Sequence, residues 1–220
     1  MDTLRIDRVF YQYNKSENQV LKDLSFSFDE GKSYAIMGPS GSGKSTLLSL
    51  LAGLDQPTGG HILLNDTSIG TMNMDLYRQN KVSMIFQAFH LLPLLTVIEN
   101  VCYPMELKGG KHHQAKGEAK KLLEAVGITK DKWHRFPQKL SGGEQQRVAI
   151  ARSIASGAKI ILADEPTGNL DAENTVMVLQ VLESLSKESG YTVIIVTHDD
   201  VVCDYVDQVL KMKDGQLHSD

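Results

Sequence analysis

The chain has 220 residues, enough for one large domain with its own buried core or for two small domains. Its 27 acidic residues outnumber its 23 basic residues, and the resulting net charge of −4 argues against a protein that binds nucleic acid through excess positive charge. Hydrophobic residues make up 41% of the chain and charged residues 23%, a composition typical of folded proteins and not of disordered ones.

We expect neither a signal peptide nor a transmembrane segment. The stretch Met1–Arg8 carries charges where a signal peptide needs an apolar run. The longest stretch without Asp, Glu, Lys or Arg, Val82–Ile98, contains polar residues and a proline, and it is shorter than the roughly 20 apolar residues of a spanning helix. The two cysteines, Cys102 and Cys203, lie far apart and suggest a reducing compartment and no disulfide framework.

Short apolar runs alternate with longer amphipathic segments along the chain. The apolar runs predict strands, in chain order, at Leu4–Val9, Val20–Phe28, Ser33–Met37, His61–Leu64, Val82–Phe86, Ile160–Ala163 and Val193–Val196. The amphipathic segments predict helices at Ser45–Ala52, Gln114–Val126, Val148–Ala155 and Ala172–Glu188. Strands that alternate with helices predict an α/β fold with a mostly parallel sheet.

A glycine-rich segment after the third predicted strand fits the phosphate-loop pattern GxxxxGK[ST] and leads into a predicted helix. Its residues are Gly38, Pro39, Ser40, Gly41, Ser42, Gly43, Lys44, Ser45 and Thr46. Glycines let the backbone turn its N–H groups toward phosphate, and the helix N-terminus favours an anion. In this pattern Lys44 is expected to reach the β- and γ-phosphates, and the Ser45 hydroxyl is expected to bind Mg²⁺. The segment predicts a nucleoside triphosphate site.

Two acidic residues, Asp164 and Glu165, end the apolar run that begins at Ile160. At the end of a strand beside a phosphate loop, an aspartate holds Mg²⁺, so we predict that Asp164 is a metal ligand. Glu165 is then placed to act as the general base that polarises the attacking water. Without the phosphate loop, Asp164 and Glu165 would be interpreted as two solvated carboxylates at the end of a strand. Because the phosphate loop is present, we favour the catalytic interpretation.

The segment Leu140–Arg147, with the sequence LSGGEQQR, precedes another predicted helix. Ser141 and Glu144 have the spacing of a capping box, which would complete the helix N-terminus. Gly142 and Gly143 leave backbone N–H groups open to an anion, which a plain cap does not require. A chain with two anion-binding helix starts could sandwich one nucleotide between two copies of itself.

With LSGGEQQR in place, the sequence resembles the nucleotide-binding domain of ATP-binding cassette (ABC) transporters over nearly its whole length. The resemblance implies a P-loop NTPase with a RecA-like core, an antiparallel β subdomain and a helical subdomain that carries the signature LSGGEQQR. It implies one ABC ATPase domain over 1–220, with the core and β subdomain at 1–87 and 157–220 and the helical subdomain at about 88–156.

The resemblance also implies roles for residues that have ordinary interpretations on their own. Tyr13 is expected to stack on adenine, with Tyr11 as the alternative. Gln87 is expected to touch Mg²⁺ and to sense a membrane partner, Asp171 to bridge two subunits, and His198 to contact the γ-phosphate. Otherwise Tyr13 would be a half-buried aromatic, Gln87 a surface amide, Asp171 a helix N-cap and His198 a strand-end histidine. The functional interpretation rests on all four occurring in the expected order.

The implied activity is hydrolysis of ATP with Mg²⁺ by a head-to-tail homodimer, in which Ser141 of one copy faces Lys44 of the other. Hydrolysis reopens the dimer and drives an integral membrane permease subunit. We therefore expect the protein at the cytoplasmic face of the cell membrane, with no transmembrane segment of its own and no direct contact with nucleic acid.

Three further segments narrow the resemblance to one branch of the family. Leu51–Gly60, Phe89–Pro93 and Glu165–Asp171 look most like the branch with lipoprotein-releasing, macrolide-export and antimicrobial-peptide efflux ATPases. Export of peptides, drugs or lipoproteins is therefore the expected process. Two alternatives stay open: the cell-division ATPase of the same branch, and an ABC ATPase that acts on nucleic acid or ribosomes. Against the second, the chain has one cassette and no long coiled coil.

The segment Gln87–Asn100 concentrates apolar side chains in a predicted loop and short helix. These side chains are Phe89, Leu91, Leu92, Leu94 and Leu95. Core packing accounts for about half of them, and an exposed remainder would mark a partner site. We predict that this segment is the surface that couples the nucleotide site to the permease.

Overall fold

The computed structural model of the chain describes residues 3–13 and 18–219. Its strands are β1 (Leu4–Tyr11), β2 (Leu21–Phe28), β3 (Ser33–Met37), β4 (Gly59–Leu64), β5 (Thr67–Ser68), β6 (Val82–Phe86), β7 (Ile160–Asp164), β8 (Thr192–Thr197), β9 (Gln208–Lys213) and β10 (Gln216–Ser219). Its α-helices are α1 (Lys44–Leu51), α2 (Met74–Asn80), α3 (Val97–Leu107), α4 (His112–Ala125), α5 (Gly142–Ala155) and α6 (Ala172–Ser189). Short 3₁₀ turns are η1 (Ile69–Thr71), η2 (Lys130–Lys132), η3 (Pro137–Lys139) and η4 (Asp200–Tyr205).

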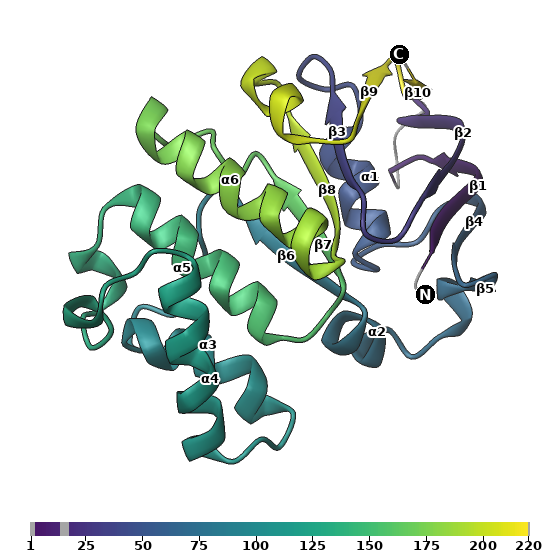
Figure 1. Cartoon of the computed structure of the whole chain (residues 1–220). Coiled ribbons are helices and arrows are strands. Elements are labelled where there is room, and N and C mark those ends of the chain that lie inside the picture. The colour runs from purple at the N-terminus through teal and green to yellow at the C-terminus, as the bar shows by residue number, and fades with distance from the viewer. Residues whose placement is uncertain (1–2, 14–17, 220) are drawn as a thin grey trace.

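Two sheets organise these elements (Figure 1). The larger has the order β10-β9-β3-β8-β7-β6 and is parallel except at the β9–β10 pair. The smaller, β2-β1-β4-β5, is antiparallel. The predicted α/β fold, with a mostly parallel sheet and an antiparallel β subdomain, is confirmed.

The central strands are buried on both faces, which explains their continuous apolar sequences. In β7, Ile161 and Ala163 join the core under α3, α4, α5 and α6. The alternating residues Ile160 and Leu162 join the other core, with α1, β1 and β2. Because side chains alternate along a strand, one short run of sequence holds both layers to the sheet.

The register of the parallel strands brings the ends of four strands to one edge of the sheet. Phe86 at the end of β6 pairs with Asp164 of β7, and Asp164 pairs with Val196 of β8. On the other side of β8, Thr197 pairs with Met37, the last residue of β3. Ligands of open α/β sheets bind at this carboxyl edge, so the topology places a site there.

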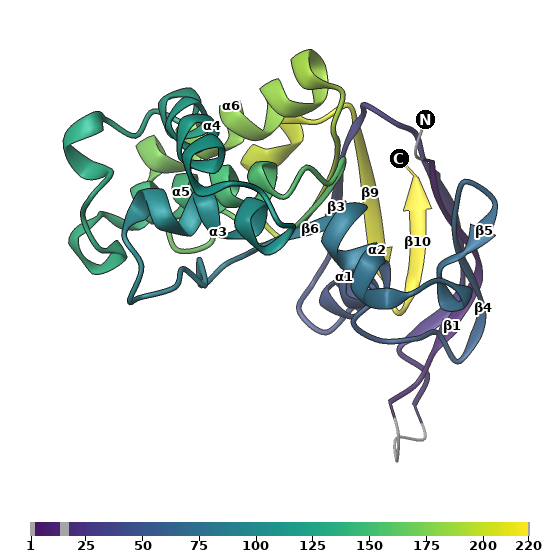
Figure 2. The same ribbon diagram turned by 90° about the horizontal axis from the view of Figure 1, so that it is seen from below.

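The helices α3, α4 and α5 fall within the interval 88–156, for which we expect a helical subdomain. In Figures 1 and 2 these helices project away from the antiparallel sheet, while α5 runs back toward the larger sheet. Helix α5 contacts α3, α4, α6 and β6, so it links the helical subdomain to the carboxyl edge of the sheet. Within the described parts of the chain, no helix combines the length and the apolar composition that crossing a membrane requires.

The predicted elements are found with shifts of at most two residues at their ends, except that α5 begins at Gly142, six residues before the predicted Val148. Several other elements were missed. Helix α3 begins at a capping box of Thr96 and Glu99 but contains Pro104, which disfavours a helix prediction because it lacks an N–H group. The missed strand β9 alternates apolar and charged residues, with Leu210 and Met212 buried. It forms because β3 offers a parallel partner far away in sequence.

Candidate functional site

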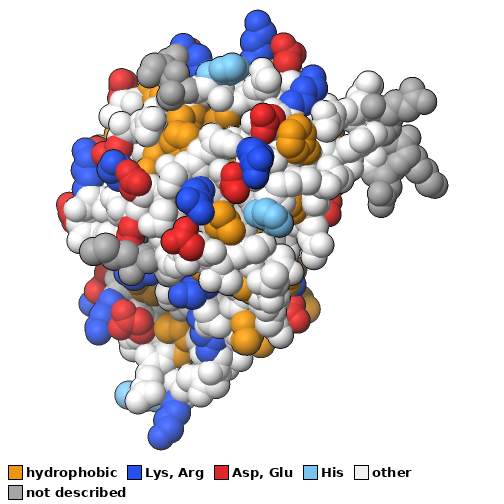
Figure 3. Space-filling view, turned by 90° about the vertical axis from the view of Figure 1, so that its right-hand side faces the viewer, with side chains coloured by type: hydrophobic (Ala, Val, Ile, Leu, Met, Phe, Trp, Pro, Cys, Tyr) orange, Lys and Arg blue, Asp and Glu red, His pale blue; other side chains and the backbone are white. Residues whose placement is uncertain are grey.

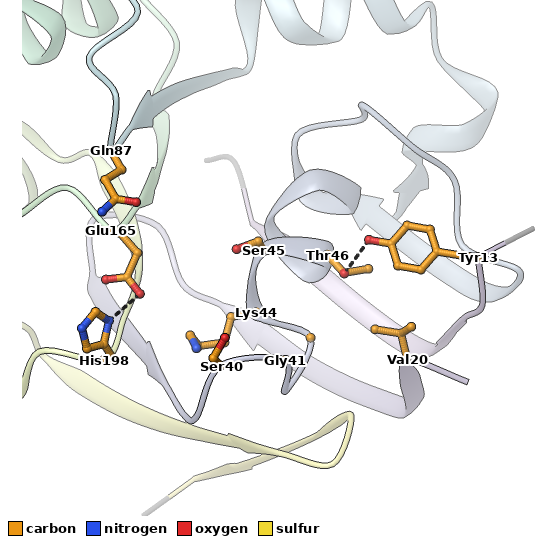
Figure 4. A pocket seen from close by; sticks show the side chains of 11 residues that line it. Tyr13, Val20, Ser40, Gly41, Lys44, Ser45, Thr46, Gln87, Glu165 and His198 are labelled. Carbon is orange, nitrogen blue, oxygen red and sulfur yellow. Dashed lines mark hydrogen bonds and ion pairs between the residues drawn. The ribbon is translucent and has the colours of Figure 1, made fainter. Parts of the chain in front are cut away.

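A cavity of about 640 Å³ opens at the carboxyl edge of the larger sheet, between the sheet, the start of α1 and the antiparallel sheet (Figure 4). It is lined by Tyr13, Val20, Ser40, Gly41, Gly43, Lys44, Ser45, Thr46, Gln87, Glu165 and His198. The structure thus brings together most of the residues predicted for one nucleotide, and it adds Val20, which we predicted only as the start of a strand.

The phosphate loop curls around the ammonium group of Lys44. Lys44 Nζ donates to the carbonyl oxygens of Gly38 at 2.7 Å and of Pro39 at 3.1 Å. Gly43, the N-cap of α1, has a φ of 105°, a left-handed conformation that glycine adopts without strain. The buried hydroxyl of Ser42 has no hydrogen-bond partner among the described residues. An unpaired buried donor at a helix start beside a lysine suits a bound anion such as phosphate.

Oxygen atoms from two elements meet between the phosphate loop and β7. Ser45 Oγ donates to Asp164 Oδ1 at 3.2 Å. Burial raises the pKa of Asp164. The hydrogen bond from Ser45 lowers this pKa and the nearby charge of Glu165 raises it, and the net pKa is raised. A cation held between these oxygens would favour the charged carboxylate. Hydroxyl and carboxylate oxygens are ligands that Mg²⁺ accepts, so Ser45 and Asp164 fit the predicted metal site.

Gln87 forms part of the opposite wall of the cavity (Figure 4). The main-chain carbonyl oxygen of Gln87 accepts a hydrogen bond from Asn169 Nδ2 at 3.3 Å. A Cβ atom built on Gly168 would lie 2.8 Å from Gln87 Nε2, so the loop after β7 packs closely on the Gln87 side chain. The amide is therefore held at the cavity by the segment that follows Glu165.

Two residues hold the carboxylate of Glu165: Thr197, the last residue of β8, and His198, which follows it. Its Oε1 accepts from His198 Nδ1 at 2.9 Å, and its Oε2 accepts from Thr197 Oγ1 at 3.0 Å. Its φ of 47° is a left-handed conformation, which is strained for a residue with a side chain and is characteristic of functional sites. No motif in the sequence points to the contact of Thr197, and the only signal for it is its position beside His198.

In the protein without nucleotide or metal, we expect the imidazole of His198 to titrate with a raised pKa, because the hydrogen bond to Glu165 favours the protonated ring. Since this pKa is raised on folding, the stability that the pair contributes is fully present below the unfolded value of about 6.5 and is lost as the pH rises through the folded value. NMR titration of the ring in the wild type and in Glu165→Gln measures the effect. An equal pKa of His198 in both proteins would contradict the pairing.

The two candidate tyrosines differ in exposure. Tyr11 is 5% exposed, and its hydroxyl donates to Asp55; burial, followed by this hydrogen bond, raises the pKa of Tyr11 to about 12. Tyr13 is 50% exposed and lines the cavity, with its hydroxyl 2.9 Å from that of Thr46 (Figure 4). Of the two rings, Tyr13 offers a face to a ligand.

The signature segment forms the N-terminus of α5 as a complete capping box. Ser141 Oγ accepts from the backbone N–H of Glu144 at 3.3 Å, and Glu144 Oε2 accepts from the backbone N–H of Ser141 at 2.9 Å. Glu144 also pairs with Lys132. None of the four residues from Ser141 to Glu144, all within the described chain, lines the 640 Å³ cavity.

Asp171 also lies outside the residues that line the cavity. It is the N-cap of α6, where Oδ1 accepts from the backbone N–H of Asn174 at 2.8 Å. The ordinary interpretation as a helix cap is therefore confirmed, and the predicted bridging role stays a prediction. The hydrogen bonds from Asn174, first from its backbone and then from its side chain, lower the pKa of Asp171.

Arg152 of α5 fixes the segment that follows Gln87, a contact that sequence analysis missed. Arg152 Nη1 donates to the carbonyl of His90 at 2.6 Å, and Nη2 donates to that of Phe89 at 3.1 Å. Phe89 and His90 have φ values of 59° and 47°, so the guanidinium stabilises two consecutive left-handed residues. No motif in the sequence pointed to this arginine, because the contact spans 62 residues.

Comparison with known proteins agrees with this geometry. The family described as ABC transporter matches residues 21–168. An uncharacterized ABC transporter ATP-binding protein, found in two strains of Mycobacterium tuberculosis, is 42% identical over 210 residues, which cover 94% of this chain and 84% of that protein. Another from Methanocaldococcus jannaschii is 43% identical over 210 residues, 93% of each chain.

Solved structures are similar over almost the whole chain. The ATP-binding cassette MJ0796, described as a dimer in a post-hydrolysis state with ADP and Pi, is 35% identical with a TM-score of 0.88 and covers 98% of both chains. The protein cbiO1 of Clostridium perfringens, described as part of the ABC transporter complex cbiONQ, is 29% identical with a TM-score of 0.89, covering 97% of this chain and 86% of its own. The chain therefore belongs to the ABC transporter family, as an ATP-binding subunit with the fold and the activity of an ABC-type ATPase.

Proposed function

We propose that this ATPase closes into a homodimer around two ATP molecules and thereby drives an integral membrane permease, in a process of export. The observation that carries the proposal is that, within one chain, the phosphate loop and the signature segment lie at different places. One cavity holds the phosphate loop with Gln87, Glu165 and His198, while the open glycines at the N-terminus of α5 do not line it. A second anion-binding helix start outside the cavity is what a site shared between two copies requires.

Within one copy, we assign the phosphates to the loop Gly38–Thr46 and the adenine to Tyr13. Lys44 would leave its carbonyl partners to meet phosphate oxygens, and the unpaired hydroxyl of Ser42 supplies another donor. Ser45, Asp164 and Gln87 would hold Mg²⁺, which neutralises charge on the phosphates when bound.

The chemical step rests on Glu165 as the general base toward water. His198 and Thr197, which hold both carboxylate oxygens without nucleotide, keep the base oriented at the cavity wall. When ATP is bound, we assign His198 to the γ-phosphate, which frees one oxygen of Glu165 for water. Catalysis by a positioned carboxylate typically contributes about 10²- to 10⁴-fold.

The second copy would complete the site with its signature segment. Ser141, Gly142, Gly143 and Glu144 form a helix start that can accept a phosphate of the other copy's ATP. A solved structure of MJ0796 described as dimeric is 36% identical to this chain, and the similarity covers 96% of that protein, which supports a dimer of two cassettes. Asp171 would then bridge the two subunits.

The permease would dock at the segment Gln87–Asn100. Leu94 is 87% exposed, whereas Leu91 packs against the core. The buried side chain of Asn100 hydrogen-bonds the backbone of Leu92, Leu95 and Thr96, so the loop presents Leu94 on a rigid turn. An exposed leucine in a loop that Asn100 holds by hydrogen bonds supports a partner surface here. This docking would place the protein at the cytoplasmic face of the cell membrane.

Resemblance to the lipoprotein-releasing, macrolide-export and peptide-efflux branch supports export. The cell-division ATPase of the same branch remains the alternative process. On the face shown in Figure 3, basic and acidic side chains are interspersed. Together with the net charge of −4, this gives no support to action on nucleic acid. Recovery of a polytopic membrane protein in a pull-down supports the permease, and recovery of RNA would support the nucleic-acid alternative.

For Tyr13→Ala we expect ATP to bind about tenfold more weakly or worse, because aromatic stacking on a base contributes about 1–3 kcal/mol. Tyr13→Trp keeps a ring face and should bind ATP nearly as the wild type does. Tyr11→Phe is the matched control, since its hydroxyl serves Asp55 and its ring is buried. Calorimetric titration with ATP measures all three, and normal affinity in Tyr13→Ala would exclude Tyr13 as the adenine platform.

Leu94→Ser should weaken capture of the membrane subunit from detergent-solubilised membranes and leave ATP hydrolysis by the isolated protein within about twofold, as surface substitutions usually do. Leu107→Ser, at the far end of α3 and also exposed, is the matched control. If Leu94→Ser loses folding and ATPase activity together but still captures the membrane subunit, the segment belongs to the core and the docking assignment is wrong.

A further inference from the structure

Asn174, in the first turn of α6, joins two segments that are expected to meet the second copy. Its Nδ2 donates to both carboxylate oxygens of Asp171, at 2.9 Å and 3.0 Å. Its Oδ1 accepts from Nη1 of Arg147 at 3.1 Å. One side chain therefore connects the loop of Asp171 to helix α5, which begins at the signature segment. No motif in the sequence points to Asn174.

The same side chain presses directly on the second glycine of the signature segment. A Cβ atom built on Gly143 would lie 1.9 Å from Asn174 Oδ1, 2.2 Å from Cγ and 2.6 Å from Cβ. Rotation of the amide alone cannot remove this overlap, because the Cβ of Asn174 is itself too close. Gly142 differs, since its nearest neighbour would be the ring of Phe89 at 3.6 Å, an ordinary contact.

The contacts of Asn174 leave little freedom between the two segments. Both oxygens of Asp171 are held, so its carboxylate cannot rotate without losing charge-assisted hydrogen bonds. Arg147 is 8% exposed, so movement of Asn174 would also cost a buried guanidinium one of its hydrogen bonds. Gly143 and Asn174 then set how closely α5 approaches α6.

We propose that Asn174 is a positioning residue, which sets the spacing between Asp171 and the Ser141–Gly143 start of α5 so that both meet the second copy together. The proposal rests on the ATP-closed homodimer put forward above. It assigns Gly143 a packing role within its own chain, in addition to any contact of its N–H group with phosphate. ATP binding by a single copy does not involve Asn174, since this residue does not line the 640 Å³ cavity.

Asn174→Asp is the sharpest substitution because it keeps the size of the side chain and the acceptor for Arg147. It replaces the amide donor by a carboxylate next to Asp171, so attraction becomes repulsion. In a Glu165→Gln background, we expect Asn174→Asp to raise the ATP concentration for half-maximal dimer by about tenfold, the effect of losing charge-assisted hydrogen bonds. Glu173→Ala changes an exposed residue in the same turn of α6, so it is the control and should leave the ATP concentration for half-maximal dimer unchanged.

A merely structural defect would also weaken ATP binding by single copies, so this quantity is measured separately. In the Ser141→Arg background, where the signature side of each shared site is blocked, ATP binding reports on single copies, and Asn174→Asp should bind ATP within about twofold of its parent. Absence of an ATP-dependent dimer in Glu165→Gln itself would overturn the homodimer and this inference with it. A dimer that forms in Glu165→Gln and equally well in Glu165→Gln/Asn174→Asp would overturn this inference alone.

The packing of Gly143 has a second test, which needs no dimer. Gly143→Ala should lower the midpoint of thermal unfolding, because the added methyl overlaps Asn174. Asn174→Gly removes the overlapping atoms, so Gly143→Ala/Asn174→Gly should unfold at a higher temperature than the sum of the two single changes predicts. Additive shifts in the double variant would show that Asn174 does not require the glycine, and would overturn the packing role.

Discussion

Glu165→Gln is expected to bind ATP as the wild type does but to hydrolyse it at least about 10²-fold more slowly, the loss typical of a missing general base. The amide has the size of the carboxylate and can still accept a hydrogen bond from Thr197 or His198, so the cavity keeps its shape. Because the closed dimer can then form but hydrolyses its ATP only slowly, we expect the ATP-bound dimer to accumulate. Size-exclusion chromatography with light scattering, in ATP and Mg²⁺, measures the mass.

Asp164→Asn is the informative comparison for this experiment, since it changes the neighbouring carboxylate. Loss of a metal ligand should shift the Mg²⁺ concentration that hydrolysis requires, whereas loss of the base in Glu165→Gln should lower the maximal rate at saturating Mg²⁺. If Glu165→Gln stays monomeric with ATP and turns over near the wild-type rate, Glu165 is not the base.

Mixing two inactive proteins is expected to restore hydrolysis if the site is shared. Ser141→Arg blocks the signature side of a site and Lys44→Ala the phosphate-loop side, so each homodimer has two defective sites. In the mixed dimer, one site combines the intact Lys44 of one copy with the intact Ser141 of the other. With random pairing and independent sites, an equal mixture should reach about a quarter of the wild-type rate.

A matched mixture with both changes on the same chain distinguishes a site shared between two chains from a site that each chain completes by itself. When the double variant Ser141→Arg/Lys44→Ala pairs with the wild type, each of the two sites contains one damaged half. These heterodimers should therefore be inactive, and the activity that remains should come from wild-type homodimers. If the single-variant mixture stays inactive while heterodimers are demonstrated, the two halves of a site do not come from two chains.

The parts of the site that local spacing predicts, without any resemblance to a family, are those encoded in one continuous segment. The phosphate loop needs only a strand, a glycine turn and a helix in succession, and β3 and α1 supply both ends within a few residues of the predictions. Similarly, the capping box of Ser141 and Glu144 depends on one helix start. Local spacing therefore predicted these features without knowledge of the fold.

The contacts that sequence analysis could not locate join segments that only the sheet brings together. Glu165 meets His198 across 33 residues because β7 and β8 are neighbours in register. Arg152 reaches the turn after Gln87 through α5, and Asn174 meets Gly143 where α5 approaches α6. None of these pairs has a spacing that helix or strand periodicity could reveal.

The choice between the two tyrosines shows the same limit. Tyr11 and Tyr13 are two residues apart, so strand alternation would place both rings on the same face and does not tell which ring is buried; β1 itself ends at Tyr11. The hydroxyl of Tyr11 donates to Asp55, in the loop before β4, and the Tyr11 ring is buried, whereas Tyr13 lines the cavity. A side chain 44 residues away thus decided which ring is available.

Site-specific cross-linking tests the shared site most directly. One protein carries Ser40→Cys in the phosphate loop and the other Ser141→Cys in the signature segment, both in the Glu165→Gln background with Cys203→Ser; the remaining Cys102 is buried. We predict that a short bismaleimide joins the two different chains when ATP and Mg²⁺ are present, and that the product disappears when ATP is omitted. Cross-linking that is equal with and without ATP, or absent in both, would contradict the composite site.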